Sequence, residues 1–258
     1  TFKYGAAIFA PRLALGGYTF DGWDREVSET MPASDVTYAA KWKPDPNTPC
    51  RVEHYFQNIS GVGYTYVSME GRSGETASTV DCASLAQAAQ GMTYSHATVD
   101  GRQETSARIK ADGSLIIKLY YNRNTYDVTF NSKGGSEVPK LTGIRYGAAV
   151  ERPANPTREG YSFGGWYKDE ACSDGQAFDF SLDKMPAENL TLYAKWVAGS
   201  YRVIFDANGG SGSTPAQDFT YDVEQALTAN SFTRTGYTFA GWNTERDGNG
   251  TSYSNGQS

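Results

Sequence analysis

The stretch Tyr126-Asp-Val-Thr-Phe130, followed by a turn at Ser132-Lys-Gly-Gly135, opens the part of the chain that decides the fold. The cluster Pro156-Thr-Arg-Glu-Gly-Tyr-Ser-Phe-Gly-Gly-Trp166 comes next, and Leu190-Thr-Leu-Tyr-Ala-Lys-Trp196 closes it. Alternating apolar and polar residues predict strands, and the glycine pairs predict tight turns. The stretch holds core-type aromatics and turn glycines without a set of catalytic groups. It therefore indicates a structural or binding repeat.

A partial copy of this pattern precedes it. Gly17-Tyr-Thr-Phe-Asp-Gly-Trp23 matches the central cluster, and Tyr38-Ala-Ala-Lys-Trp42 matches the closing strand with one residue inserted. The opening strand has no counterpart there, so we predict that residues 1–43 are the C-terminal part of a repeat. A fixed frame with loops of variable length is typical of repeat proteins.

A second partial copy follows the complete one. Tyr201-Arg-Val-Ile-Phe-Asp-Ala-Asn-Gly-Gly210 matches the opening, and Gly236-Tyr-Thr-Phe-Ala-Gly-Trp242 matches the central cluster. No closing strand comes before Ser258, so we predict a complete repeat at 125–198 and a truncated one at 199–258. We read the chain as a segment of a longer protein.

Residues 44–124 follow a different pattern and begin with a proline-rich linker, Lys43-Pro-Asp-Pro-Asn-Thr-Pro49. Alternation predicts strands at 51–57 and 64–67, joined through a glycine turn. Residues 109–121 read as a strand–turn–strand with Asp112-Gly113 at the bend. Residues 81–90 are rich in Ala, Leu and Gln and stop at Gly91, which predicts a helix. Two hairpins and one helix indicate a small α+β module of the β-grasp kind.

Composition narrows the function classes. The chain has 258 residues, a net charge of −6, 18 Tyr, 12 Phe, 5 Trp and 28 Gly. Frequent glycine turns favour a β-rich chain. Lysines and arginines are scattered, which argues against nucleic acid as a partner. Because no apolar run approaches the roughly 20 residues that span a bilayer, we expect no membrane insertion within this sequence.

Three cysteines are too few for a disulfide framework in a chain of this size. Cys50 and Cys82 fall in one module and could pair, provided that their geometry allows it. Cys172 lies in another repeat and looks single.

The repeat pattern resembles the internalin-type B-repeat, also called the Listeria–Bacteroides repeat. The resemblance rests on Val-x-Phe-x-x-x-Gly-Gly, Pro-Thr-Arg-x-Gly-Tyr-x-Phe-x-Gly-Trp and Leu-Tyr-Ala-Lys-Trp, and it covers residues 1–43, 125–198 and 199–258. The module at 44–124 is similar to mucin-binding-protein repeats in its Val52-Glu-His-Tyr opening and its Asp112-Gly-Ser-Leu-Ile-Ile-Lys-Leu-Tyr-Tyr close. The resemblance implies small β-grasp (ubiquitin-like) modules in an elongated array on the bacterial cell surface, with little or no helix in the B-repeats.

The repeated aromatics allow two interpretations. Their flat faces could stack on sugar rings, or they could fill the core of a small module that is short of buried area. We favour the core, and we expect Trp166→Ala to unfold the repeat. The predicted anchors are Trp23, Trp42, Tyr161, Phe163, Trp166, Tyr193, Trp196, Tyr237, Phe239 and Trp242.

Two other features of the sequence have simple structural interpretations. Arg158 and Arg234 recur and could pair with a carboxylate or stack on a repeat aromatic, although the same position could face a ligand. Asp247-Gly-Asn-Gly-Thr251 resembles the start of a calcium loop but lacks the final bidentate Glu, so we predict a hairpin turn.

The sequence does not point to an enzyme. His54 and His96 are the only histidines, and His54 would matter for catalysis only if Cys50 and a carboxylate met it in a cleft. The cysteines and histidines are not spaced as the ligands of a zinc site are, and we expect no cofactor.

We therefore expect non-enzymatic stalk or spacer repeats that contribute to adhesion, located outside the cell on a bacterial surface. The alternative is a binding module for a host glycan or host protein. In either case we expect a monomer.

Overall fold

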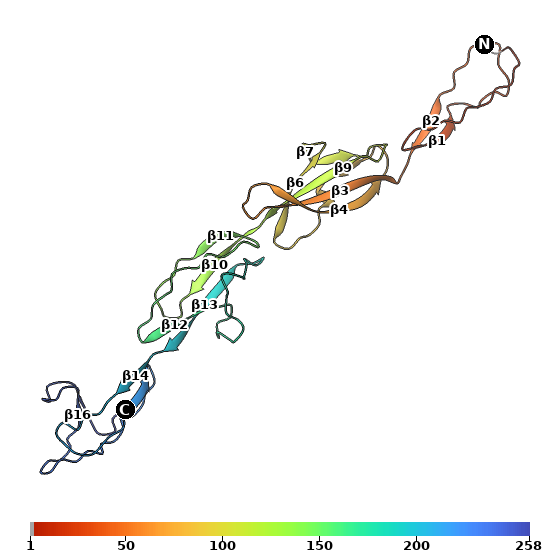
Figure 1. Cartoon of the computed structure of the whole chain (residues 1–258). Helices are drawn as coiled ribbons and strands as arrows, with labels where there is room; N and C mark the ends of the chain where they lie inside the picture. The colour runs from red at the N-terminus through yellow and green to blue at the C-terminus, as the bar shows by residue number, and fades with distance from the viewer. Residues whose placement is uncertain (1–2) are drawn as a thin grey trace. The chain divides into compact units, whose positions relative to one another are not determined.

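The computed structural model describes residues 3–258 and divides into two compact units. The first takes the residues up to 126 together with 143–148 and 184–188, and the second takes 127–142, 149–183 and 189–258. Both consist of short strands and turns (Figure 1). The β-rich prediction is confirmed.

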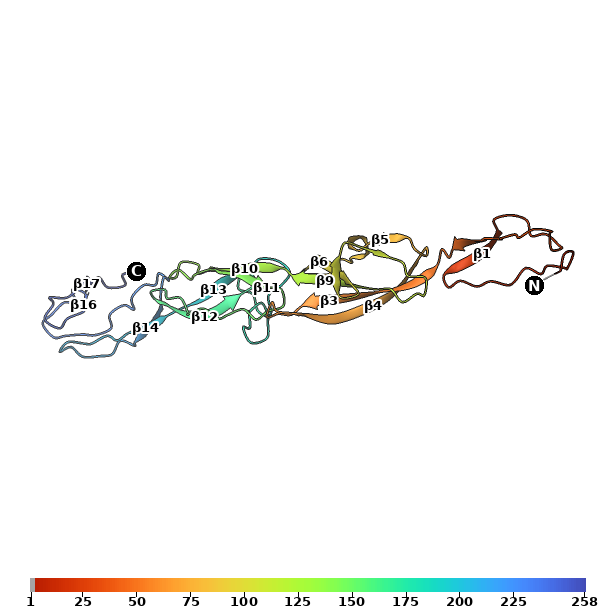
Figure 2. The same ribbon diagram turned by 90° about the horizontal axis from the view of Figure 1, so that it is seen from above.

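The first unit begins with the partial repeat. Strand β1 (Tyr18–Trp23), labelled in Figure 2, pairs antiparallel with β2 (Ala40–Pro44). The register of the pair shifts between Phe20 and Trp23. The sheet is small, and in residues 3–43 every side chain keeps at least part of its surface exposed.

The middle module is built on a five-stranded sheet in the order β4-β3-β9-β6-β7. Its centre is the parallel pair of β3 and β9, and the other neighbours are antiparallel. The two strands of a smaller sheet, β5 and β8, pair antiparallel. The bounds are β3 Thr48–Gln57, β4 Tyr64–Gly74, β5 Thr79–Asp81, β6 Met92–Val99, β7 Arg102–Glu104, β8 Ser106–Arg108 and β9 Ile116–Arg123.

The core of this module follows the alternation of its central strands. Val52 and His54 on β3 point inward, as do Ile117, Leu119 and Tyr121 on β9, and all five are at most 4% exposed. The first predicted hairpin is confirmed as β3 and β4.

The second predicted hairpin is only partly right. The turn at Asp112-Gly113 exists, with Gly113 at φ +71° and the Gly113 amide donating to the carbonyl of Lys110. The strands on its two sides do not pair with each other, because β8 pairs with β5 while β9 lies between β3 and β6. Ile109, just before the turn, is buried in the core.

The predicted helix at 81–90 is wrong. A single 3₁₀ turn, η1 (Ala83–Leu85), takes its place, and Ala86 is already extended at ψ 136°. The amide of Gln87 donates to the hydroxyl of Tyr121 and so is not used in a helical bond. A tertiary hydrogen bond from the core thus outweighs the local preference of Ala, Leu and Gln.

In the complete repeat, four strands form a sheet in the order β11-β10-β13-β12. β10 and β13 run parallel, and β12 pairs antiparallel with β13 through a bulge between Phe163 and Gly165. Gly165 has φ +115°, which only glycine adopts readily. The bounds are β10 Thr125–Asn131, β11 Leu141–Arg145, β12 Tyr161–Tyr167 and β13 Leu190–Ala198.

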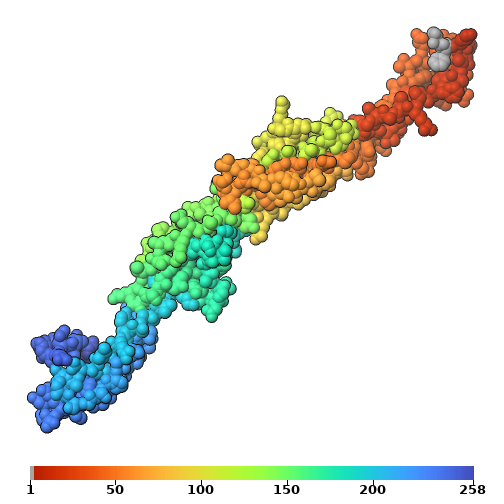
Figure 3. Space-filling model, viewed as in Figure 1, coloured from red at the N-terminus to blue at the C-terminus, as the bar shows by residue number. Residues whose placement is uncertain are grey.

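The last copy is less regular. It has two short antiparallel pairs, β14 (Ser200–Val203) with β15 (Gln217–Thr220) and β16 (Trp242–Asn243) with β17 (Ser252–Tyr253). Within residues 199–258, all of which are described, Thr214 alone is buried. Figure 3 shows the end of the chain in dark blue, and hydrogen bonds from the amides of Leu227 and Asn230 to Gln257 and Asn255 connect it to the earlier part of this copy.

Candidate functional site

Trp166 occupies the core of the complete repeat. It is 2% exposed and packs against Phe130 at 4.9 Å and Phe163 at 5.4 Å between ring centroids. Gly165 at the bulge lets the strand turn this indole inward. A buried ring cannot stack on a sugar, so the arrangement favours packing for this residue.

Trp196 is half-buried and lies over the opening turn of the same repeat. Its Nε1 donates to the carbonyl of Ser132 at 2.8 Å, and a Cβ on Gly135 would overlap its ring. Phe163 packs edge-on against it at 5.6 Å. This tryptophan therefore ties the closing strand to the Gly-Gly turn.

The other predicted anchors divide into two groups. Trp23 and Trp42 both pack on Phe20, and Trp242 packs on Phe205 at 4.5 Å. Half-buried anchors are Trp23, Trp42, Tyr161, Phe163, Tyr193, Trp196 and Trp242. Tyr237 and Phe239 differ from the expectation, because they are 68% and 38% exposed.

Arg158 and Arg234 stack on the tyrosines three residues later. The guanidinium carbon lies 3.9 Å from the ring of Tyr161 in one copy and 4.2 Å from that of Tyr237 in the other. Both arginines therefore stack on a repeat aromatic, which is one of the structural roles that the sequence suggests for them. In the Asp247 loop, the carboxylate accepts from the amide of Asn249 between β16 and β17, as a hairpin turn requires.

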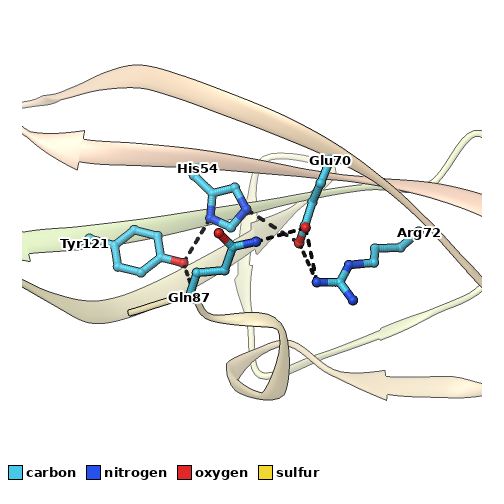
Figure 4. Close-up of polar contacts among 5 residues, drawn as sticks. All are labelled: His54, Glu70, Arg72, Gln87 and Tyr121. Carbon is cyan, nitrogen blue, oxygen red and sulfur yellow. Dashed lines mark hydrogen bonds and ion pairs between the residues drawn. The ribbon is translucent and has the colours of Figure 1, made fainter. Parts of the chain in front are cut away.

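The middle module contains a polar cluster that extends from the buried His54 and Tyr121 to Glu70, Arg72 and Gln87 nearer the surface (Figure 4). Nδ1 of His54 lies 2.9 Å from the hydroxyl of Tyr121, and Nε2 lies 3.7 Å from the carboxylate of Glu70. Glu70 also accepts from Gln87 and Arg72. The buried Nε2 of His54 has no hydrogen-bond partner, because 3.7 Å to Glu70 is longer than a hydrogen bond.

This cluster does not form a nucleophile–base pair with the cysteines. Cys50, Cys82 and Cys172 are buried free thiols, and burial raises the pKa of Cys50 and of Cys82. A raised pKa lowers the thiolate fraction and hence the reactivity. The bridge considered between Cys50 and Cys82 is not formed in this structure. Within residues 3–258, no group of three or more His, Cys, Asp or Glu side chains is placed to hold a metal ion.

The opposite face of the same sheet carries an aromatic row that the sequence analysis missed. It consists of Tyr55, Tyr64, Tyr66, His96 and Tyr120. Tyr120 stacks on Tyr55 at 5.1 Å and on His96 at 4.6 Å, with the latter rings nearly parallel. Tyr66 is 52% exposed and packs edge-on against Tyr55. Strand alternation predicts that these side chains lie opposite the core, but it does not predict that the rings lie together.

Charged groups flank this aromatic row. The Tyr55 hydroxyl donates to Glu53 at 2.7 Å, and this hydrogen bond, more than burial, raises the pKa of Tyr55. Lys118 lies 5.4 Å from the Tyr55 ring centroid and 3.7 Å from Glu53. Beside them is a hollow of about 240 Å³, lined by Thr98, Asp100, Gly101, Ser114, Ile116 and Lys118. The face thus combines stacked rings with hydrogen-bonding groups at their edge.

The repeats also match known proteins. Residues 126–195 and 201–258 match the Listeria–Bacteroides repeat domain. The chain is 41% identical over 107 residues to Internalin H of Listeria monocytogenes, covering 40% of this chain and 18% of that protein. These findings support an internalin-type B-repeat.

Two relatives in Evansella cellulosilytica agree with this. One, whose name describes a membrane protein, is 42% identical over 139 residues, covering 53% of this chain and 20% of that protein. The other, named as a Gly-rich membrane protein, is 35% identical over 134 residues, covering 52% and 15%. The chain thus spans about a fifth or less of each relative. Together the matches indicate a repeat region of a surface protein.

Helices long and apolar enough to cross a bilayer are not found in residues 3–258.

Proposed function

We propose that this chain is a run of non-enzymatic spacer repeats that holds other parts of a bacterial cell-surface protein away from the cell wall. One observation carries the proposal: the aromatics that define the repeat are used for packing. Trp166 is buried, and Trp196 is bonded to the turn of its own repeat. A side chain used in this way contributes to a module's stability and leaves little apolar surface for a ligand. We also propose that the protein containing these repeats is anchored to the bacterial cell wall.

Small-angle X-ray scattering of the chain, with and without residues 125–198, tests the spacer. β13 has nine residues. At about 3.3 Å each, one repeat contributes roughly 30 Å along its strands. Removing the repeat should shorten the maximum dimension by about that amount. An unchanged maximum dimension would mean that the repeat does not add reach.

A second function, glycan binding by the middle module, is favoured by the aromatic row. Partly exposed stacked rings with Glu53 and Lys118 at their edge offer what a saccharide needs, namely a flat apolar face and polar groups around it. This candidate makes the module an adhesive element between spacers, with a host glycan as the partner and the chain acting as a monomer.

A glycan microarray followed by NMR titration of the best oligosaccharide tests this second function. Tyr66→Ala removes a half-exposed ring of the row and should weaken binding at least tenfold. Tyr237→Ala, which removes an exposed tyrosine in the last repeat, is the matched control and should leave affinity unchanged. Equal effects of both changes, or no binding by the unmodified chain, would remove the glycan candidate.

A further inference from the structure

A three-residue backbone relay lies where the complete repeat meets the last copy. The amide of Gly199 donates to the carbonyl of Gly160 at 2.7 Å, and the amide of Tyr221 donates to the carbonyl of Gly199 at 2.8 Å. Gly160 comes just before β12, Gly199 separates β13 from β14, and Tyr221 follows β15. The single linker residue is thus held by hydrogen bonds on both sides, and all three residues lie in the second unit.

The same relay recurs where the middle module meets the complete repeat. The amide of Asn124 donates to the carbonyl of Gly91, and the amide of Tyr146 donates to the carbonyl of Asn124, both at 2.9 Å. Gly91 precedes β6, Asn124 separates β9 from β10, and Tyr146 follows β11. These positions correspond one by one to those of the other relay, although the sequence around Gly91 is not that of a B-repeat. All three residues lie in the first unit.

A third relay joins the first partial repeat to the middle module, also within the first unit. The amide of Asp45 donates to the carbonyl of Gly17 at 2.9 Å, and that of Thr76 donates to the carbonyl of Asp45 at 2.8 Å. Gly17 precedes β1, Asp45 follows β2, and Thr76 comes after β4. The topological position is again the same, but here backbone covers the glycine, since a Cβ on Gly17 would lie 2.6 Å from the carbonyl oxygen of Ala111.

In the two relays that end on a tyrosine, the ring of that tyrosine covers the glycine. A Cβ on Gly160 would overlap the ring of Tyr221, and a Cβ on Gly91 would overlap the ring of Tyr146. Both glycines also have positive φ, +73° and +66°. The glycine therefore meets two needs at once, a left-handed turn and a flat surface for a ring.

Further contacts hold Tyr221 over its glycine. Its ring packs edge-on against that of Tyr161 at 5.5 Å, and the Tyr161 hydroxyl donates to Asp222 at 2.9 Å. Arg158 stacks on the ring of Tyr161, so the Arg-x-Gly-Tyr part of the repeat motif is grouped at this joint. This gives those residues a role that core packing does not explain.

We propose that, at the two joints whose relay ends on a tyrosine, the glycine turn of one module is a docking surface for the next module along the chain. The docking partner is the turn that presents this tyrosine directly after the second strand of that next module. The docked ring and the clamped linker residue couple the folding of neighbouring modules. The glycine sets the specificity, because any side chain there excludes the ring. The spacer function does not depend on this docking, because a flexible joint can also separate two surfaces. A negative result in the docking test would therefore not contradict the spacer proposal.

Amide hydrogen exchange followed by NMR on the full chain tests the joint. Gly160→Ala should speed exchange at the amides of Gly199 and Tyr221 at least tenfold, while the amide of Leu192 in β13 stays protected. The matched control is Gly236→Ala. Gly236 has φ +79° and comparable strain, but no atom lies within 4 Å of its Cβ position. That variant should change exchange at Gly199 and Tyr221 less than twofold.

Tyr221→Ala is the second variant in this experiment. If Gly160→Ala unfolds the repeat, the result for Tyr221→Ala alone tests the proposal. This variant should produce the same local rise in exchange, and adding Gly160→Ala to it should then have less than a twofold further effect, because the ring is already gone. The proposal is overturned if Gly160→Ala and Tyr221→Ala each leave both amides within twofold of the unmodified chain. It is equally overturned if Gly236→Ala gives the same rise, or if the effects of the two changes simply multiply.

Discussion

At the scale of single residues, the aromatics of the repeat differ in what they do although they share one motif. Trp166 is buried, Trp196 is half-buried and hydrogen bonded, and Tyr237 is largely exposed in a copy that lacks the closing strand pattern. The motif therefore marks positions in a frame, and the neighbouring strands decide whether a ring at such a position is covered.

Trp166→Ala should destabilise the complete repeat by about 3–5 kcal/mol, because a large buried ring is replaced by a cavity. Chemical denaturation monitored by circular dichroism measures the change. Tyr237→Ala is the control and should alter stability by no more than about 0.5 kcal/mol, as an exposed side chain does. A folded Trp166→Ala chain of unchanged stability would show that this residue is not a core anchor.

The buried thiols should respond to pH in a direction set by their burial. Burial raises the pKa of Cys50 and of Cys82, so the thiolate fraction of each stays small at a pH where an exposed thiol has largely ionised. After reduction, the alkylation rate of the native chain should keep rising with pH beyond the pH at which the rate in denaturant levels off. In denaturant the rate should level off near the ordinary thiol pKa of about 8.5. Identical pH profiles in both states would contradict the raised pKa values.

At the scale of the elements, alternation and glycine spacing predicted β3 with β4, the opening strand β10 and closing strand β13 of the complete repeat, and the Asp112-Gly113 turn, but not β11. These depend on local sequence, where the side-chain period and turn chemistry act directly. The pairing of β8 with β5 and the loss of the helix could not be predicted in this way. Both depend on distant groups, above all on the Tyr121 hydroxyl that takes the amide of Gln87.

The aromatic row was missed for a related reason. Alternation places Tyr55 and Tyr120 opposite the core, but it does not say that β3 and β9 are neighbours in parallel register. That register puts Tyr55 beside Tyr120 and so brings their rings together. The aromatic row therefore depends on tertiary pairing, whereas the repeat anchors follow from their own motif.

The last copy should exchange its amide hydrogens faster than the complete repeat. Residues 199–258 contain a single buried residue, while residues 125–198 include the buried Val128, Trp166 and Leu192. Few buried contacts and short strands are features of segments that open locally at low cost. Hydrogen exchange mass spectrometry measures the difference, and equal protection of the two segments would contradict it.

At the scale of the whole molecule, the chain is a succession of small modules, two of which have substantial cores of their own. Residues 44–124 are packed around β3 and β9, and residues 125–198 around Trp166 and its neighbours. The two repeats at 126–195 and 201–258 could be predicted from the sequence because both carry the same motif. The relays at the joints could not, since each depends on backbone groups from three separated segments.

The central claim is that these modules are separately packed elements in series, as a spacer requires. Single-molecule force spectroscopy, with the chain held at its two ends, tests it most directly. At about 3.4 Å per residue, unfolding of 44–124 and of 125–198 should each lengthen the chain by roughly 240 Å once the folded length is subtracted. The account predicts two resolved steps of about that size. Smooth extension without steps, or one step of twice the length, would contradict it.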